Sequence, residues 1–197
     1  MDRDESLEKI KQEVLDLKSS PLYEDRVANR AFPVIGEGSH EAEMMFIGEA
    51  PGENEAKAGR PFCGRSGKLL DELFLSVQIK RESVYVTNIV KDRPPKNRDP
   101  KPEEIELYAP FLDRQIEIIK PKIIATLGRF SMDYIMNRYG LSAQIGPIGR
   151  LHGQVFLTTI SGQNVKVVPL YHPAVALYNP NNKQELLRDF QILKTLI

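Results

Sequence analysis

The sequence has few of the residues that build disulfides, metal sites and membrane spans. Among its 197 residues there is one cysteine, Cys63, there are three histidines, and there is no tryptophan. A single thiol excludes an internal disulfide and a metal site made of cysteines alone, and the scattered histidines lack the spacing of zinc ligands. No apolar run is long enough to span a bilayer, and the charged first residues do not resemble a secretory signal. A cytoplasmic location is therefore expected.

The chain also lacks an excess of charge of either sign. Its 27 Lys and Arg balance 27 Asp and Glu, so the formal net charge is +0. This balance gives no support to a strongly basic nucleic-acid binder, although a local basic face is compatible with it. Hydrophobic residues make up 41% and charged residues 27%, as in an ordinary globular protein. The length, without repeats or a linker, predicts one domain over residues 1–197.

What the sequence does contain is an alternation of apolar runs and amphipathic segments. Apolar or β-rich runs predict strands at 43–48, 83–90, 122–128, 154–160 and 165–173. Helical periodicity predicts helices at 4–18, 66–77 with Ser66 as N-cap, 102–120, 129–140 and 182–197. Three runs are almost unbroken, which favours a parallel sheet covered on both faces in an α/β fold.

Chemically able residues stand at the ends of the predicted strands. Glu49 follows the first run, Asn88 and Gly128 lie at the ends of the next two, and His172 lies near the end of the last. In open parallel sheets ligands bind outside the carboxyl ends of the strands. We therefore expect these residues, far apart in sequence, to converge on one site.

A glycine-rich loop follows the first strand. The segment "GEAPGENEAKAGRPFCGRSGKLLD" holds five glycines. Interpreted as a phosphate loop, "GRPFCGRS" has Arg65 where the Walker pattern needs Lys, and it does not directly follow the strand. A solvated loop whose glycines only make turns leaves Glu49 and Phe62 unexplained. A pocket for a flat polar ring uses both, with Asn88 reading the ring edge, and fits a nucleobase taken out of its stack.

Several motifs together resemble the family 4 uracil-DNA glycosylases of bacteria and archaea. They are "GEAPGENEAKAGRPFCGRSGKLLDEL", "VYVTNIVKDRPPKNRDPKPEEI", "KPKIIATLGRF", "LHGQVF" and "YHPAVALYNPN". The resemblance begins near residue 17 and runs to the C-terminus. It implies a three-layer α/β/α fold around a mainly parallel four-stranded sheet. It also implies hydrolysis of the N-glycosidic bond of a flipped deoxyuridine, which starts base-excision repair by leaving an abasic site.

The resemblance implies a role for each pocket residue. Glu49 would orient or activate the attacking water, and His172 would donate to uracil O2. Phe62 would stack on the ring, Asn88 would read O4 and N3–H, and Glu55 would crowd the 5 position against the methyl group of thymine. The backbone that closes on the nucleotide would come from Gly48, Ala50, Pro51 and Gly52.

DNA contacts are expected from two further segments. Phosphate contacts are predicted for Arg65, Ser66, Gly67, Lys68 and Lys91, with Arg150 and His152 near a further loop. The wedge that enters the duplex would be Val175, Ala176 or Leu177. The implied partner is uracil-containing DNA, single- or double-stranded. We expect a monomer without membrane contact, followed by enzymes that process abasic sites.

The sequence departs from the family at its iron–sulfur ligands. Most members hold a [4Fe–4S] cluster on four cysteines, and the aligned positions here are Leu17, Ser20, Asp92 and Tyr108. Without thiolates no cluster of the usual kind can be held, so we expect no cofactor and no metal. We expect Leu17, pointing inward from the helix at 4–18, and Tyr108 to replace it by apolar packing, with Ser20 and Asp92 hydrogen-bonded.

Two alternatives to a monofunctional uracil-DNA glycosylase stay open. One is a DNA-binding protein of the same fold that has lost turnover, against which the intact Glu49, Asn88 and His172 argue. The other is a glycosylase that prefers another deaminated base, hypoxanthine or xanthine, whereas Glu55 and Asn88 favour uracil. The chain lacks the arginine-rich insert through which a related branch attaches covalently to DNA, so turnover is expected.

Overall fold

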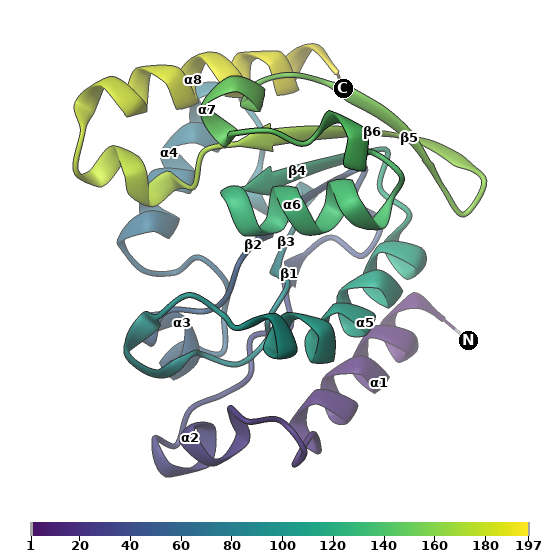
Figure 1. Ribbon diagram of the computed structural model, residues 1–197, viewed down its shortest axis with the longest axis vertical. Coiled ribbons are helices and arrows are strands. Elements are labelled where there is room, and N and C mark those ends of the chain that lie inside the picture. The colour runs from purple at the N-terminus through teal and green to yellow at the C-terminus, as the bar shows by residue number, and fades with distance from the viewer. Residues whose placement is uncertain (1, 197) are drawn as a thin grey trace.

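The computed structural model describes residues 2–196 and contains one mixed sheet (Figure 1). The strand order is β1-β3-β2-β4-β6-β5. The strands are β1 (Glu37–Gly38), β2 (Met44–Gly48), β3 (Tyr85–Asn88), β4 (Ile123–Leu127), β5 (Phe156–Ile160) and β6 (Gln163–Leu170). The four central strands run parallel, as expected, and β1 and β5 add an antiparallel strand at each edge. The sheet thus has six strands, two more than the four that the resemblance implies. The apolar runs predicted β5 as well, so β1 is the one strand that no pattern in the sequence indicated.

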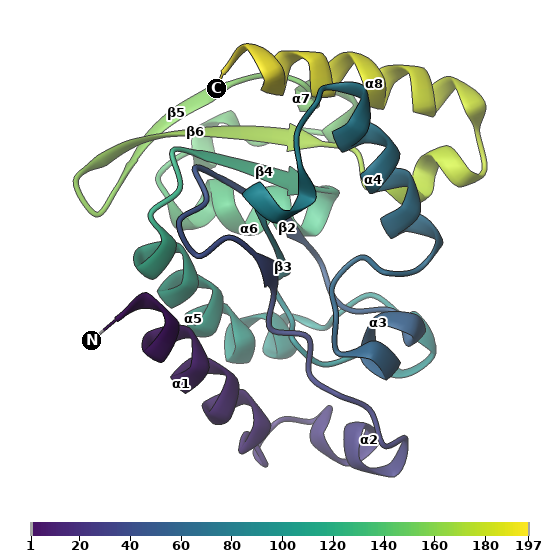
Figure 2. The same cartoon turned by 180° about the vertical axis from the view of Figure 1, so that it is seen from behind.

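Helices cover both faces of this sheet. They are α1 (Arg3–Leu15), α2 (Tyr23–Ala28), α3 (Glu53–Ala58), α4 (Arg65–Ser76), α5 (Pro102–Ile119), α6 (Arg129–Arg138), α7 (Ile148–Leu151) and α8 (Pro180–Thr195). Helices α1, α5 and α6 lie on one face, and α4 and α8 on the other (Figures 1 and 2). In residues 2–196 no helix combines the length and apolar character needed to cross a membrane.

The apolar runs are unbroken because both faces of each central strand are buried. In β2, Met45 and Ile47 pack toward α1, α5 and α6, whereas Met44 and Phe46 pack toward α4 and α8. Successive side chains of a strand point to opposite faces, so a strand between two helical layers needs apolar residues at every position. The three-layer prediction is confirmed for this reason.

Among the helix boundaries that differ from the prediction, those of α1 and α4 bear on the residues singled out above. Helix α1 starts with a capping box between Asp2 and Glu5 but ends at Leu15, so Leu17 lies in the following turn. Helix α4 begins one residue before Ser66, and its N-cap is Gly64. Ser66 therefore sits in the first turn rather than capping it, which leaves its side chain free to face the site described below.

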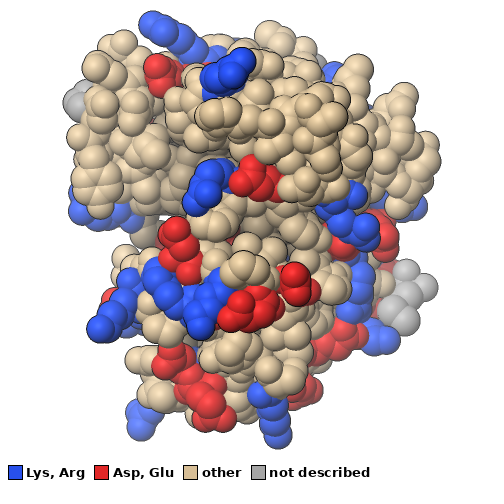
Figure 3. All heavy atoms as spheres, in the orientation of Figure 1, with Lys and Arg blue, Asp and Glu red and all other residues tan. Residues whose placement is uncertain are grey.

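Charge is mixed over the surface. On the face shown in Figure 3, Lys and Arg side chains are interspersed with Asp and Glu. In the described chain several Lys and Arg pair directly with acids, as Lys57 does with Glu53 and Arg138 with Asp113. Exposed pairs of this kind add little stability, but they prevent a single-sign field over this face.

Candidate active site

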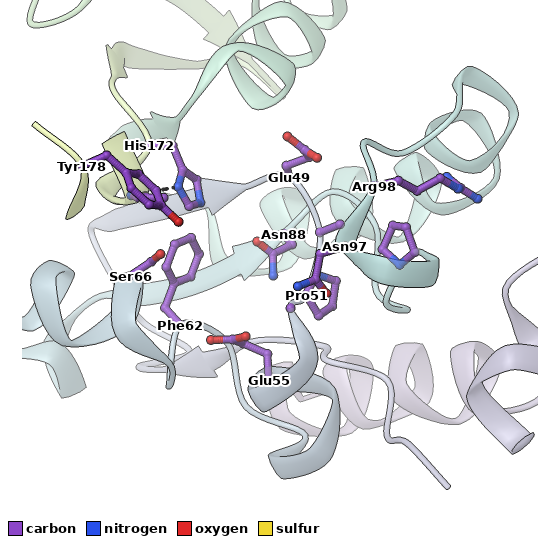
Figure 4. A pocket seen from close by; sticks show the side chains of 14 residues that line it. Glu49, Pro51, Glu55, Phe62, Ser66, Asn88, Asn97, Arg98, His172 and Tyr178 are labelled. Carbon is purple, nitrogen blue, oxygen red and sulfur yellow. Dashed lines mark hydrogen bonds between the residues drawn. The ribbon is translucent and has the colours of Figure 1, made fainter. Parts of the chain in front are cut away.

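A cavity of about 440 Å³ opens at the carboxyl ends of the parallel strands (Figure 4). Its lining is Glu49, Ala50, Pro51, Gly52, Glu55, Phe62, Ser66, Asn88, Pro94, Asn97, Arg98, His172, Ala174 and Tyr178. The predicted convergence of Glu49, Asn88 and His172 is thus observed. Gly128 does not join them in the lining; it is the N-cap of α6, against the Cβ atom of His172.

Glu49 directly follows β2 and is held there by its backbone. Its carbonyl accepts a hydrogen bond from the Val90 amide at 3.0 Å, which extends the pairing of β2 with the β3 side. Burial, reinforced by the carboxylate of Asp99 and opposed by Arg129, raises the pKa of Glu49 to about 7. A carboxylate with a pKa near neutrality is suited to accept a proton from water.

His172 has one ring nitrogen engaged and one free. Its Nδ1 accepts a hydrogen bond from the Ala174 amide at 3.1 Å, at the start of the 3₁₀ helix Pro173–Leu177. Burial lowers the pKa of His172 to about 4, so the ring is neutral at neutral pH. Because Nδ1 is an acceptor, the proton of the neutral ring lies on Nε2. The cavity is thus offered a neutral N–H donor.

Asn88, at the end of β3, brings an unpaired amide oxygen to the cavity. The residue is 2% exposed, and its Oδ1 has no hydrogen-bond partner in the part of the chain described. An unpaired buried polar atom costs free energy, so such atoms are retained mainly where a ligand completes them. The close-up shows the amide directed into the cavity between Phe62 and Asn97 (Figure 4).

Lys91 is buried and supports Asn88 through hydrogen bonds. Its ammonium group donates to the Asn88 carbonyl at 2.6 Å, to Gln115 Oε1 at 2.6 Å and to Thr87 Oγ1 at 2.8 Å. The side chain is fully buried, and burial lowers its pKa well below the ordinary value. The prediction that Lys91 contacts DNA is therefore wrong; its hydrogen bonds fix the strand end that carries Asn88.

Two glycines make room for Phe62. A Cβ atom at Gly48 would lie 2.7 Å from the Phe62 ring and 2.3 Å from Asn88 Oδ1. A Cβ atom at Gly67 would lie 1.8 Å from the Phe62 carbonyl oxygen. Gly67 is buried at this contact, where it serves packing, and its predicted DNA contact stays a prediction. Phe62 itself adopts a φ of 48° and lies 5.6 Å from the His172 ring.

Glu55 holds the loop that carries Phe62. Its Oε1 accepts hydrogen bonds from the amides of Cys63 at 3.1 Å and Gly64 at 2.8 Å, while the side chain lines the cavity. The half-buried Cys63 faces this carboxylate, and burial raises the pKa of its thiol. Cys63 is accordingly a thiol at neutral pH and not an activated nucleophile.

Five residues of the lining were not predicted from the sequence: Pro94, Asn97, Arg98, Ala174 and Tyr178. Pro94, Asn97 and Arg98 belong to the loop before α5, where Arg98 is fixed by two hydrogen bonds to the buried Glu104, at 2.8 and 2.5 Å. The proline-rich segment "RPPKNRDP" signalled a loop but not the side of the molecule on which it lies. Ala174 lies in the 3₁₀ helix Pro173–Leu177, and Tyr178 follows it.

The other predicted DNA contacts divide into exposed and partly buried residues. Arg65 and Lys68 are exposed on the first turn of α4, as is Arg150 on α7. His152 is partly buried: its Nδ1 lies 2.8 Å from Asp189 Oδ2 and its ring lies 4.3 Å from that of Tyr171. The wedge candidates Val175, Ala176 and Leu177 are partly buried and pack against the core under α4 and α8.

A buried polar network includes three of the four positions that the resemblance aligns with cluster cysteines: Ser20, Asp92 and Tyr108. The Tyr108 hydroxyl donates to Asp92 Oδ2 at 2.5 Å and lies 2.8 Å from Ser20 Oγ. Arg26 Nη1 bonds both oxygens of Asp92, at 3.2 and 3.0 Å. We call Ser20, Arg26, Asp92 and Tyr108 the polar network. The predicted hydrogen bonding of Ser20 and Asp92 is confirmed.

The network joins four segments: α1, α2, the segment after β3, and α5. Arg26, in α2, also donates to the carbonyls of Val14 at 3.0 Å and Leu15 at 2.6 Å, the last turn of α1. Asp92 follows Lys91 in the segment after β3, and Tyr108 lies in α5. Arg26 was missed because nothing local in the sequence shows which acid it pairs with. Leu17 packs partly buried against the adjoining core, from the turn and not from the predicted helix.

These residues do not fit an iron–sulfur cluster. The cluster needs thiolates, whereas this position offers hydroxyl, phenol, carboxylate and guanidinium groups that already bond one another. Within residues 2–196 there is also no group of three or more His, Cys, Asp and Glu that could hold a metal ion.

Comparison with known proteins identifies the family. The profile described as "Uracil DNA glycosylase superfamily" matches residues 35–193. A "Type-4 uracil-DNA glycosylase" of Sulfurisphaera tokodaii is 47% identical over 193 residues, 98% of this chain and 85% of that protein. Proteins of the same name from Archaeoglobus fulgidus (42% identical, 95% and 91% covered) and Thermotoga maritima (38%, 99% and 96%) are similarly related. The chain therefore belongs to the uracil-DNA glycosylase superfamily and, within it, to the type-4 uracil-DNA glycosylases.

Proposed function

We propose that this protein hydrolyses the N-glycosidic bond of a flipped deoxyuridine in DNA, releasing uracil and leaving an abasic site. The observation that carries the proposal is the buried, unpaired Asn88 amide facing one cavity with the neutral His172 and the half-buried Glu49. These groups are an edge reader, a hydrogen-bond donor and a base. The curated relatives bear the name of the same activity.

Recognition of uracil follows from the amide and the aromatic ring. A base turned out of the duplex enters the cavity and stacks on Phe62. Asn88 Oδ1 accepts from uracil N3–H, and its amino group donates to O4, because an amide offers one acceptor and a donor. Cytosine has an amino group at position 4 and an acceptor at N3, so it opposes both bonds. Glu55, fixed by its two backbone amides, borders the same cavity and would restrict the 5 position.

Bond breaking is assisted from two sides of the nucleotide. The electron pair of the C1′–N1 bond moves into the uracil ring, and the charge collects on O2. His172 Nε2–H donates to that oxygen, and a preorganised donor of this kind lowers the barrier by about 3–4 kcal/mol. Glu49 takes a proton from water as the water oxygen bonds C1′, and its negative charge stabilises the cationic sugar.

The nucleophile is water, which makes the enzyme monofunctional. A glycosylase that also cleaves the strand uses an amine as nucleophile. No lysine is found in the cavity lining within the described residues, and the Lys91 ammonium is enclosed by Thr87, Asn88 and Gln115.

We further propose that the enzyme works without a [4Fe–4S] cluster. The polar network joins α1, α2, α5 and the segment after β3, so it supplies a fastening where thiolates are missing. In this proposal the enzyme is a single domain and a cytoplasmic, nucleoid-associated monomer. It acts on single- or double-stranded DNA, and enzymes that process abasic sites act after it.

The test is release of free uracil from duplex DNA that carries one deoxyuridine. Wild-type protein should release uracil, while the Glu49→Gln and His172→Ala variants should release it at least about 100-fold more slowly. Matched duplexes with hypoxanthine, xanthine or thymine test base preference. Binding of the uracil duplex without release by the wild type would contradict the proposal and favour a binding protein. Faster release of hypoxanthine or xanthine than of uracil would contradict its substrate.

A further inference from the structure

The residue before His172 is held by its side chain and not by its main chain. Leu170, the last residue of β6, accepts a hydrogen bond from the Gly128 amide at 2.9 Å, and the His172 carbonyl accepts one from the Val175 amide at 3.0 Å. Between them, the main chain of Tyr171 makes no backbone hydrogen bond within residues 2–196. The direction in which the His172 ring enters the cavity therefore depends in part on where the Tyr171 side chain is held.

His152, which follows α7, holds the Tyr171 side chain by stacking. The centroids of the two rings lie 4.3 Å apart, and their planes are inclined by 31°. Successive side chains of an extended segment point in opposite directions. Tyr171 thus faces the His152 ring and does not line the cavity, whereas the next residue, His172, lines it. The stack with His152 fixes the Tyr171 side chain where the main chain has no ladder bond.

Asp189, in α8, fixes the His152 ring in turn. Its Oδ2 lies 2.8 Å from His152 Nδ1, and the residue is 4% exposed. A Cβ atom at Gly153 would lie 2.5 Å from Asp189 Oδ1, so only a glycine after His152 lets the carboxylate approach the main chain this closely. The Gly153 amide donates to the Pro169 carbonyl of β6 at 2.8 Å. The turn that carries His152 is thus fastened to both α8 and β6, which lie beside α7 in both views (Figures 1 and 2).

The carboxylate of Asp189 has little choice of partner. Burial raises the pKa of Asp189, and the hydrogen bond and charge of His152 oppose that rise. A buried carboxylate without a partner costs free energy, so the bond to His152 is not readily exchanged for one to water. Neither residue lines the cavity or belongs to the polar network, so the proposed reaction leaves the pair without a role.

We propose that His152 and Asp189 position His172 for its donation to uracil O2, acting through the Tyr171 ring. This inference rests on the proposed function and deepens it by naming residues outside the cavity on which the rate depends. A donor stabilises developing charge only when it is held close to the productive geometry, and a displacement of about 1 Å can slow a reaction about 100-fold. Loss of the pair should therefore lower the rate of bond breaking and leave the affinity for DNA nearly unchanged.

Substitution of His152 separates positioning from stability. His152→Asn keeps an amide donor for Asp189 but removes the ring that stacks on Tyr171, so the variant should fold. Its single-turnover rate of uracil release from duplex DNA should fall about tenfold, while its Kd for the same duplex should change little. His40→Ala is the matched control, because it removes another His–Asp pair, with Asp4, outside the cavity lining. The control should retain the wild-type rate.

Substitution of Asp189 tests the other member of the pair. Asp189→Ala removes the acceptor that holds the His152 ring and should slow release about as much as His152→Asn does. Asp189→Asn keeps an acceptor for His152 and should restore most of the wild-type rate. Thermal unfolding of each variant shows that it is folded at the temperature of the assay.

Nuclear magnetic resonance of the ring nitrogens reports on His172 without relying on catalysis. The chain has three histidines, so His40→Ala and His152→Asn assign the three rings by elimination. The His172 signals of His152→Asn should shift or broaden, whereas those of His40→Ala should match the wild type. A pair that served stability alone would leave the His172 signals unmoved.

The outcomes separate this inference from the proposed function. Absence of uracil release by the wild type, with shifted His172 signals in His152→Asn, would overturn the proposed function while showing that the pair sets the His172 ring. Uracil release by the wild type, with a full rate or unmoved His172 signals in His152→Asn, would overturn the inference alone.

Discussion

The active-site cavity and the polar network use similar chemical groups in opposite ways. In the network, the carboxylate of Asp92 is bonded by Tyr108 and Arg26 within the protein. In the cavity, Asn88 Oδ1 has no partner among residues 2–196, and burial raises the pKa of Glu49 to about 7. Paired groups hold segments of the chain together, whereas unpaired groups can form hydrogen bonds with a substrate. Lys91 bonds the backbone of Asn88 at the cavity, whereas Asp92, the next residue in the sequence, belongs to the polar network.

The largest expected effect comes from breaking the polar network. Asp92→Ala leaves the buried guanidinium of Arg26 without its carboxylate, and loss of one partner of a buried pair lowers stability by about 3–5 kcal/mol. Urea unfolding measures this loss. Uracil release by the folded fraction should change far less. A variant as stable as the wild type would show that the network does not fasten the fold.

His172→Ala, in the active site, should lower the rate of uracil release strongly and the stability little, the opposite of Asp92→Ala. Removal of the donor to uracil O2 should slow release about 100- to 1,000-fold. The midpoint of urea unfolding should change little by comparison with Asp92→Ala, because the ring's Nδ1 makes only a local bond to Ala174. A full rate for this variant would remove His172 from the mechanism.

A smaller effect is expected on the pH dependence of thermal stability, through Glu49. The pKa of Glu49 is raised from 4.5 to about 7 on folding, so the folded state binds more protons between these values. Stability contributed by the protonated group is therefore lost as pH rises through 7. Glu49→Gln, which cannot ionise, should unfold at a higher temperature than the wild type at pH 8, with little difference near pH 4. It should also be inactive. Equal melting temperatures at both pH values would argue against a strained carboxylate.

The smallest expected effect is a shift in the pH profile. For kcat/KM, uracil release should rise with pH through a midpoint near 7, as Glu49 ionises in the free enzyme. Asp99→Asn removes a negative neighbour and should move the midpoint down, while Arg129→Gln removes a positive one and should move it up. Shifts in the same direction for both variants would contradict the assignment of this limb to Glu49.

The sequence predicted what depends on local pattern and on the order of the strands. The parallel core followed from unbroken apolar runs, and the convergence of Glu49, Asn88 and His172 followed from their positions at strand ends. Side-chain direction was less accessible. Lys91 looked like a surface cation but is buried, since nothing in "NIVKD" reveals that Gln115, in α5, supplies an acceptor.

Partners distant in sequence were equally hard to foresee. Arg26 and Asp92 are separated by 66 positions, and the pairing depends on how α2 packs beside the loop after β3. Tyr178 was missed for a related reason, because its place in the cavity lining depends on how the segment after His172 folds.

The central claim is that this cavity excises uracil while a polar network, rather than a cluster, fastens the fold. The most direct measurement is the single-turnover rate of uracil release from a uracil-containing duplex, made on protein whose iron content has been determined. The account predicts a full rate for iron-free wild-type protein and a rate at least about 100-fold lower for His172→Ala. Activity confined to a fraction that carries stoichiometric iron, or equal rates for the two proteins, would contradict it.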